Sequence, residues 1–175
     1  MITALISTGP TQSIRNILTQ HAWNVCLHMN PEIPWLDRDS ALILGHRVLR
    51  HMQRGLYGRS DDVHSRVFIL VPELCPEGLW HYHGFAWINS ARSTKKLMRN
   101  GPDWFTKCVH GFIRKGGCWI PKHLGGAADM NLDRISPSAL VQPLTDPLEP
   151  VWYAEKNWLR DGKEELVCLD GHVTR

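Results

Sequence analysis

One stretch of the sequence, residues 66–88, constrains the fold more than any other. It contains two apolar runs with strand character, 66–73 and 79–88, separated only by the segment LCPEG. The proline and glycine of that segment favour a tight reversal of the chain. Two strands joined by so short a connection run antiparallel, because a parallel crossover needs a dozen or more residues. The chain is therefore expected to contain a β-hairpin.

Strand and helix patterns are interleaved in the rest of the chain. Residues 22–29 alternate apolar and polar side chains, which is typical of a strand. Asp37 is expected to cap a helix that ends at GLYGRS. The apolar stripe of this helix comprises Ala41, Leu44, Gly45, Val48, Leu49 and Met52.

After the hairpin, two helices are predicted at 90–101 and 102–117, because Pro102 is favoured in the first turn of a helix. The remaining predicted elements are a strand near 129–135, a proline-spaced loop at 136–150, a helix at 151–162 and a short edge strand within 164–173. The expected fold class is α+β, with a central antiparallel sheet flanked by helices. Residues 1–20 are expected to be an N-terminal lead-in, and 21–175 a single domain without a helicase domain.

The hairpin carries a candidate metal site. Successive strand residues alternate between faces, so His81 and His83 share one face while Tyr82 points to the other. With the turn centred near Glu77, Glu73 lies opposite His81, where cross-strand Cβ atoms are roughly 5 Å apart. Two imidazoles and one carboxylate suit one divalent ion, Mg²⁺ or Mn²⁺, and zinc accepts the same ligands. The competing interpretation is a pair of hydrogen-bonded core histidines, and Cys75 is a weaker candidate ligand.

A second polar constellation is predicted on the helix at 151–162. The side chains at i, i+3, i+4 and i+7 share one helix face, and here these positions are Tyr153, Lys156, Asn157 and Arg160. Such a face is common on ordinary surface helices. Beside a metal site, however, a tyrosine hydroxyl could attack a phosphodiester, and a lysine could stabilise the negative charge that develops.

Charge and composition allow a nucleic-acid partner without requiring one. The 175 residues carry a formal charge of +3, and eight of them are tryptophans, which pack against flat surfaces as well as in cores. Basic side chains concentrate on the predicted helices. Together with two residues of the tyrosine helix, these are the candidate nucleic-acid contacts: Arg47, Arg50, Lys95, Lys96, Arg114, Lys115, Asn157 and Arg160.

Cysteine usage and hydropathy bear on the compartment. The five cysteines are scattered and never spaced as CxxC, which disfavours a disulfide framework and a zinc ribbon. The N-terminal residues lack the basic segment of a signal peptide, and no window is apolar enough to span a membrane. The expected location is the cytoplasm of a host cell, without a membrane partner.

Taken together, these motifs resemble the HUH endonuclease superfamily, and specifically its single-tyrosine replication-initiator (Rep) branch. HYH at 81–83 is similar to the histidine–hydrophobe–histidine motif, and YAEK at 153–156 is similar to the YxxK nucleophile motif. WNVCLHMNP at 23–31 stands where the family's first strand motif is expected, and Glu73 stands in the place of the third ligand. The order of these elements along the chain is also that of the family.

The resemblance implies a fold related to the ferredoxin-like or RNA-recognition fold. It also implies Mg²⁺- or Mn²⁺-dependent nicking and joining of single-stranded DNA through a phosphotyrosine intermediate. Tyr153 would be the nucleophile, and Lys156 would assist it. The implied role is initiation of rolling-circle replication of a plasmid or virus, with single-stranded or hairpin origin DNA as substrate and a host helicase and replication machinery as partners.

Two alternatives remain open. Within the same chemistry, the chain could be a single-tyrosine transposase or a plasmid relaxase, although relaxases usually have a third histidine and an N-terminal tyrosine. From a different class, it could be a non-catalytic nucleic-acid-binding protein with a basic, tryptophan-rich sheet. Formation of a covalent protein–DNA adduct distinguishes the enzymes from the binding protein.

Overall fold

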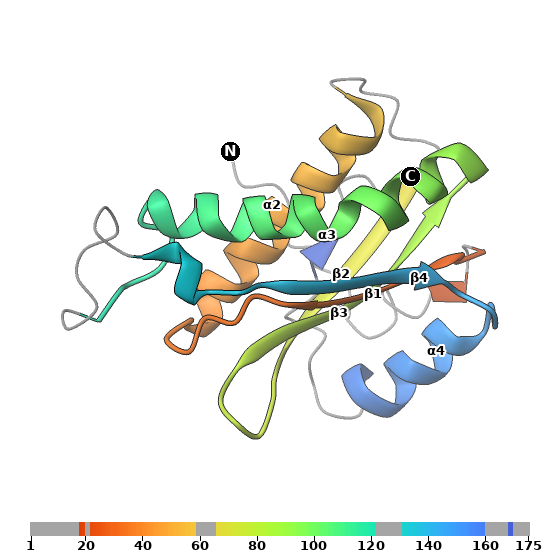
Figure 1. Ribbon diagram of the computed structural model, residues 1–175. Helices are drawn as coiled ribbons and strands as arrows, with labels where there is room; N and C mark the ends of the chain where they lie inside the picture. The colour runs from red at the N-terminus through yellow and green to blue at the C-terminus, as the bar shows by residue number, and fades with distance from the viewer. Residues whose placement is uncertain (1–17, 20–21, 59–65, 122–130, 160–167, 170–175) are drawn as a thin grey trace.

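The computed structural model describes residues 18–19, 22–58, 66–121, 131–159 and 168–169. It confirms the α+β class: a five-stranded antiparallel sheet of order β4-β1-β3-β2-β5 has helices on both of its faces (Figure 1). The strands are β1 (Val25–Asn30), β2 (Arg66–Leu74), β3 (Trp80–Ile88), β4 (Ser138–Pro143) and β5 (Cys168–Leu169). The helices are α2 (Arg38–Tyr57), α3 (Ala91–Arg114) and α4 (Glu149–Tyr153), with 3₁₀ helix η3 (Leu132–Arg134) and π-helix η4 (Ala154–Leu159). Within these described ranges, no helix combines the length and apolar character that crossing a bilayer requires.

The predicted hairpin is confirmed, with its register. β2 and β3 pair antiparallel over their whole length, and Glu73 lies directly opposite His81. β3 is the central strand, because β1 pairs with its other edge and places His28 opposite His83. The hairpin thus sets the alignment of every side chain on this part of the sheet.

Helix α2 also forms as predicted. The carboxylate of Asp37 caps its N-terminus by accepting a hydrogen bond of 2.8 Å from the backbone N–H of Ser40. The helix ends at Tyr57, and Gly58 follows with a positive φ of 72°, a conformation that glycine adopts without strain. All six residues of the predicted apolar stripe are buried.

The prediction of two helices at 90–101 and 102–117 is wrong, because one helix, α3, runs through Pro102. An interior proline removes one backbone hydrogen bond and costs about 3 kcal/mol. The apolar stripe, however, continues in helical phase across the proline: Leu97, Gly101, Phe105, Val109 and Phe112 are all buried. A single helix buries both halves of this stripe in one core, whereas a break at residue 102 would separate them.

The region after α3 departs furthest from the predictions. In place of the strand predicted near 129–135, the described residues form the short η3, and the predicted loop contains β4. Among the described strands, β4 is an edge strand that pairs with β1 alone. Val141 is its one buried residue, so the strand pattern in its sequence is weak. β5 confirms the predicted edge strand in the tail. The predicted helix 151–162 is realised as α4 and η4, and residues 160–162 lie outside the described residues.

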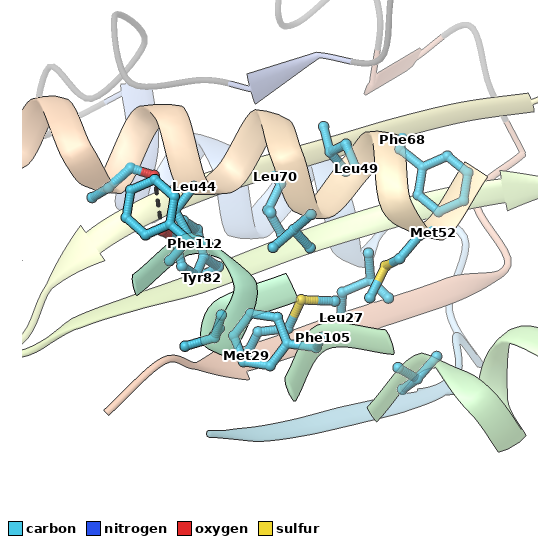
Figure 2. Packing of buried hydrophobic residues seen from close by; sticks show 14 of the residues in the cluster. Leu27, Met29, Leu44, Leu49, Met52, Phe68, Leu70, Tyr82, Phe105 and Phe112 are labelled. Carbon is cyan, nitrogen blue, oxygen red and sulfur yellow. Dashed lines mark hydrogen bonds between the residues drawn. The ribbon is translucent and has the colours of Figure 1, made fainter. Parts of the chain in front are cut away.

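The two faces of the sheet have separate cores. The larger core packs α2 and α3 against one face and includes Leu27, Phe68 and Leu70 (Figure 2). Tyr82 belongs to this core, and its hydroxyl donates a hydrogen bond of 2.8 Å to the backbone carbonyl of Ala41. A smaller core on the opposite face contains Ile69, Val71 and Phe85 under the segment that carries Ala154. Figure 1 shows α4 on this second side.

Gly84 is required by the close approach of the two hairpin strands. A Cβ atom at this position would collide with the backbone carbonyl oxygen of Ile69 and lie 2.9 Å from the Leu70 side chain. Overpacking of this kind typically costs about 1–3 kcal/mol. We expect Gly84→Ala to lower the free energy of unfolding by about 2 kcal/mol, measured by urea denaturation.

Gly111 provides a matched control for this prediction. It lies within α3, and nothing lies within 4 Å of an added Cβ. Because alanine is the better helix former, Gly111→Ala should raise the free energy of unfolding by up to about 1 kcal/mol. Equal effects of the two substitutions would contradict the steric argument at Gly84.

Candidate metal centre and tyrosine

Three side chains of the hairpin converge on the sheet face opposite α2 and α3. Nε2 of His81 and of His83 lie 3.5 and 3.9 Å from Oε2 of Glu73. One potential ligand atom from each residue lies within 4.8 Å of the others, as a shared ion requires. Glu73 is buried, and both histidines are half-buried. These residues therefore fit a divalent metal ion, and the alternative ligand Cys75 is not part of the group.

The buried carboxylate of Glu73 is the feature that most favours a ligand site. It interrupts the apolar series of Ile69 and Val71 on the same strand face, where a burial-driven pattern would continue with another apolar residue. A buried carboxylate is costly unless it is paired or coordinates a metal. The two imidazoles lie 3.5 and 3.9 Å from this carboxylate, and a cation bound between the three side chains would neutralise its charge.

Tyr153 lies beside these three residues, although it comes from the C-terminal part of the chain. Its hydroxyl donates a hydrogen bond of 3.5 Å to Oε2 of Glu73, a residue 80 positions earlier. Its ring lies 5.2 Å from the His83 ring and 6.1 Å from the Phe85 ring, measured between centroids. The predicted nucleophile and the predicted metal ligands therefore meet in one site.

The local structure around Tyr153 explains its position. Tyr153 is the last residue of α4, and the π-helix η4 begins at the next residue, Ala154, which is fully buried. Ala154 packs in the smaller core against the sheet, which places the preceding tyrosine at the edge of that core beside His83. Short π-helical segments are frequent at functional sites.

The surroundings of Tyr153 oppose its ionisation. Burial raises the pKa of the phenol well above its usual value, and the negative charge and hydrogen bond of Glu73 raise it further. In the absence of a cation, the neutral phenol is the stable form, and it donates its proton toward Glu73. A positive charge beside Glu73 would lower the pKa of the Tyr153 phenol.

The other residues predicted on the tyrosine helix are only partly placed. Lys156 lies in η4 and is exposed. The side chain of Asn157 and the whole of Arg160 lie outside the described residues. Of the four polar side chains predicted to share one helix face, Tyr153 and Lys156 lie within the described residues; Tyr153 is half-buried beside His83, whereas Lys156 is exposed.

Apart from Arg160, the basic residues predicted to contact nucleic acid occupy the opposite side of the sheet from the metal centre. They lie on α2 and α3, or directly after α3, and these helices cover the larger core. All are exposed except Lys96, which is partly buried: Arg47, Arg50, Lys95, Lys96, Arg114 and Lys115. A phosphodiester bound at the metal centre would therefore not meet these side chains.

The sequence reasoning missed His28 as a neighbour of the site. The His28 ring lies edge-on to the His83 ring at 4.5 Å between centroids, and its Nε2 is 3.2 Å from Sγ of Cys26. Burial lowers the pKa of His28. The alternation in residues 22–29 already separated Cys26 and His28 from the apolar face of that strand, but only the pairing of β1 with β3 brings His28 to His83.

Comparison with models of known protein families, with curated proteins and with solved structures found no match to this chain. The functional argument therefore depends on the residues of the site and their geometry.

Proposed function

We propose that this protein is a metal-dependent endonuclease of the HUH kind that nicks and rejoins single-stranded DNA through a tyrosine nucleophile. The observation that carries the proposal is the 3.5 Å contact between the Tyr153 hydroxyl and Glu73. Two motifs that are each common in unrelated sequences become informative when the fold brings them together. Chance occurrence of the two motifs in the sequence would not by itself bring the tyrosine and the two histidines to one carboxylate.

The chemistry follows from the groups present. Glu73, His81 and His83 would hold the ion, which would be Mg²⁺ or Mn²⁺ and would polarise the phosphodiester. The Tyr153 oxygen attacks phosphorus, the bond from phosphorus to the 3′-oxygen breaks, and the phenolic proton is lost to the surroundings while the leaving oxygen gains one. The products are a 5′-phosphotyrosine and a free 3′-hydroxyl. Attack by a 3′-hydroxyl on the phosphotyrosine reverses these steps and rejoins the strand.

The biological role that suits this reaction is initiation of rolling-circle replication of a plasmid or virus. A single nucleophilic tyrosine leaves one covalent end and one free 3′-hydroxyl, which can prime synthesis. In this role the substrate is single-stranded or hairpin origin DNA, and unwinding falls to a host helicase that works with the replication machinery. The cytoplasm of a host cell is the compartment in which these partners are found.

Formation of a covalent adduct tests the proposal directly. The purified protein is incubated with Mn²⁺ and a pool of 5′- or 3′-labelled single-stranded oligonucleotides of random sequence, then denatured in SDS. We expect the protein to retain the 3′ label and not the 5′ label, because the tyrosine is joined to the 5′-phosphate of the strand that lies 3′ of the cut. EDTA should abolish formation of this adduct. A wild-type protein that binds Mn²⁺ and single-stranded DNA but forms no adduct would instead favour the non-catalytic binding protein.

Lys156 gives a second, independent prediction. Lys156 lies three residues after Tyr153, and we propose that its ammonium stabilises the charge that develops on the phenolic or phosphoryl oxygen. Loss of one such donor costs about 10²–10³ in rate in other enzymes. We expect Lys156→Ala to reduce the single-turnover rate of nicking by about 100-fold with little change in DNA affinity, and Lys156→Arg to recover part of it.

The neighbouring Glu155 provides the control for Lys156, because both side chains are exposed in η4. Glu155→Ala should retain a nicking rate near that of the wild type. If Lys156→Ala also remains within about twofold of the wild type, Lys156 has no catalytic role and is a solvated surface residue.

A further inference from the structure

The helix layer on the side away from the metal centre has a large excess of positive charge. α2 and α3 together contain ten of the 20 Lys and Arg residues but only two of the 17 Asp and Glu residues, Asp39 and Asp103. The rest of the chain has the other ten basic residues against 15 acidic ones. The formal charge of +3 is therefore the sum of two strongly basic helices, α2 and α3, and a net acidic rest of the chain.

Basic side chains of both helices lie along the line where the two helices pack. The guanidinium of Arg47 lies 5.0 Å above the Phe112 ring, and Nζ of Lys96 donates a hydrogen bond of 3.4 Å to the backbone carbonyl of Leu56. These two contacts show that α2 and α3 run antiparallel, side by side. We call this surface the basic seam; its members are Arg47, Arg50, Arg54, Lys96 and Lys107.

Charge on the basic seam is only weakly neutralised. Within the described residues of the two helices, the acidic side chain that meets it is Asp103, which pairs with Lys107 at 2.6 Å. Both partners of that pair are largely exposed, so water and salt screen their attraction. Arg47, Arg50 and Arg54 are exposed on α2, where no acidic residue follows Asp39 in the first turn.

The spacing of these arginines suits a regular row of phosphates. Positions 47, 50 and 54 lie at i, i+3 and i+7, so they share one face and span about 10 Å along the helix. Duplex DNA has one negative charge per about 1.7 Å of its axis, so several phosphates lie within that span. The helix fixes the backbone positions of the arginines before any ligand binds.

The seam has the charge of a nucleic-acid site but not the aromatic surface of a single-strand site. Proteins that bind single strands combine a positive groove with exposed rings on which bases stack. In the described part of the chain, the exposed large aromatic residues are Trp119 and Trp152, and neither lies on α2 or α3. Phe112 is buried beneath Arg47, and Trp104 is partly buried beside Lys96.

We propose that the basic seam is a second DNA-binding surface that holds the phosphate backbone of a duplex, on the opposite side of the sheet from the metal centre. Backbone contacts of this kind position a protein on DNA without reading its sequence. The protein would hold duplex DNA on its helical side while presenting the metal centre on the other. This inference does not depend on the nicking reaction, because it concerns binding alone.

The test measures binding in EDTA, so that cleavage plays no part. The affinity of the full-length protein for a labelled 20-base-pair duplex is measured by fluorescence anisotropy from 50 to 300 mM salt. The test variant is Arg50→Gln with Arg54→Gln, which retains the contact of Arg47 with Phe112. The control is Arg38→Gln with Arg134→Gln, two exposed residues outside the seam that give the same change in net charge.

We expect the seam variant to bind the duplex about tenfold or more weakly and to lose about two units of the slope of log affinity against log salt. The control variant should stay within about threefold, and His81→Ala should bind the duplex as the wild type does. Equal losses in the seam and control variants would overturn the proposal. So would a wild-type preference for single strands over the duplex, or stronger binding to phosphatidylserine vesicles than to the duplex.

Discussion

Tyr153→Phe should eliminate the covalent protein–DNA adduct while leaving the affinity for single-stranded DNA within about threefold of the wild type. The substitution removes a single oxygen atom, and that oxygen is the group that would form the bond to phosphorus. The ring remains, so its packing against His83 and Phe85 is retained. SDS gel electrophoresis of a labelled oligonucleotide measures adduct formation, and a filter-binding assay measures affinity.

Tyr57→Phe is the matched control, since it removes the same atom at the last residue of α2, away from the metal centre. It should form the adduct at the wild-type rate. Tyr82 is less suitable, because its hydroxyl bonds to Ala41 in the larger core and its loss would affect folding. An adduct of undiminished intensity in Tyr153→Phe would place the nucleophile elsewhere and remove the basis of the proposed function.

His81→Ala and His83→Ala should each abolish both Mn²⁺ binding and nicking, with a small effect on stability. Each variant leaves only two of the three ligands, and both side chains are half-buried, so truncation creates little cavity. Isothermal titration calorimetry with Mn²⁺ measures binding, and urea denaturation measures stability. Loss of nicking together with loss of metal binding would tie the reaction to the ion.

His28→Ala is the control that the structure offers for this experiment. It removes an imidazole that touches His83 but is not part of the three-ligand group. The variant should still bind Mn²⁺, with an affinity at most about 10–100-fold weaker than that of the wild type, which is the usual cost of losing a supporting neighbour of a metal ligand. If the wild-type protein itself shows no Mn²⁺ binding, the two histidines are structural, and the core-histidine interpretation holds.

Local patterns predicted the hairpin and its register well. The alternation of a strand and the centre of one short turn are sufficient to place Glu73 opposite His81. The N-cap at Asp37 is equally local, because its side chain bonds to a backbone group three residues away. Such features need no knowledge of the rest of the fold.

Features that depend on distant partners could not be read from the sequence. α3 continues through Pro102 because both of its halves pack in one core, and β4 exists because β1 offers it a free edge. The neighbour His28 becomes visible only once β1 is paired with β3. The contact between Tyr153 and Glu73 was expected from the resemblance of the motifs, but its geometry depends on how α4 and Ala154 pack on the sheet.

The separation of Tyr153 from Glu73 by 80 residues also sets an order of events during synthesis of the chain. The ribosome adds all three metal ligands of the hairpin before it adds the tyrosine. A nascent protein could therefore acquire its metal ligands well before it acquires its nucleophile. Under the proposed function, a chain that ends before residue 153 lacks the nucleophile and cannot cut DNA, so premature termination would yield inert fragments and not unregulated nucleases.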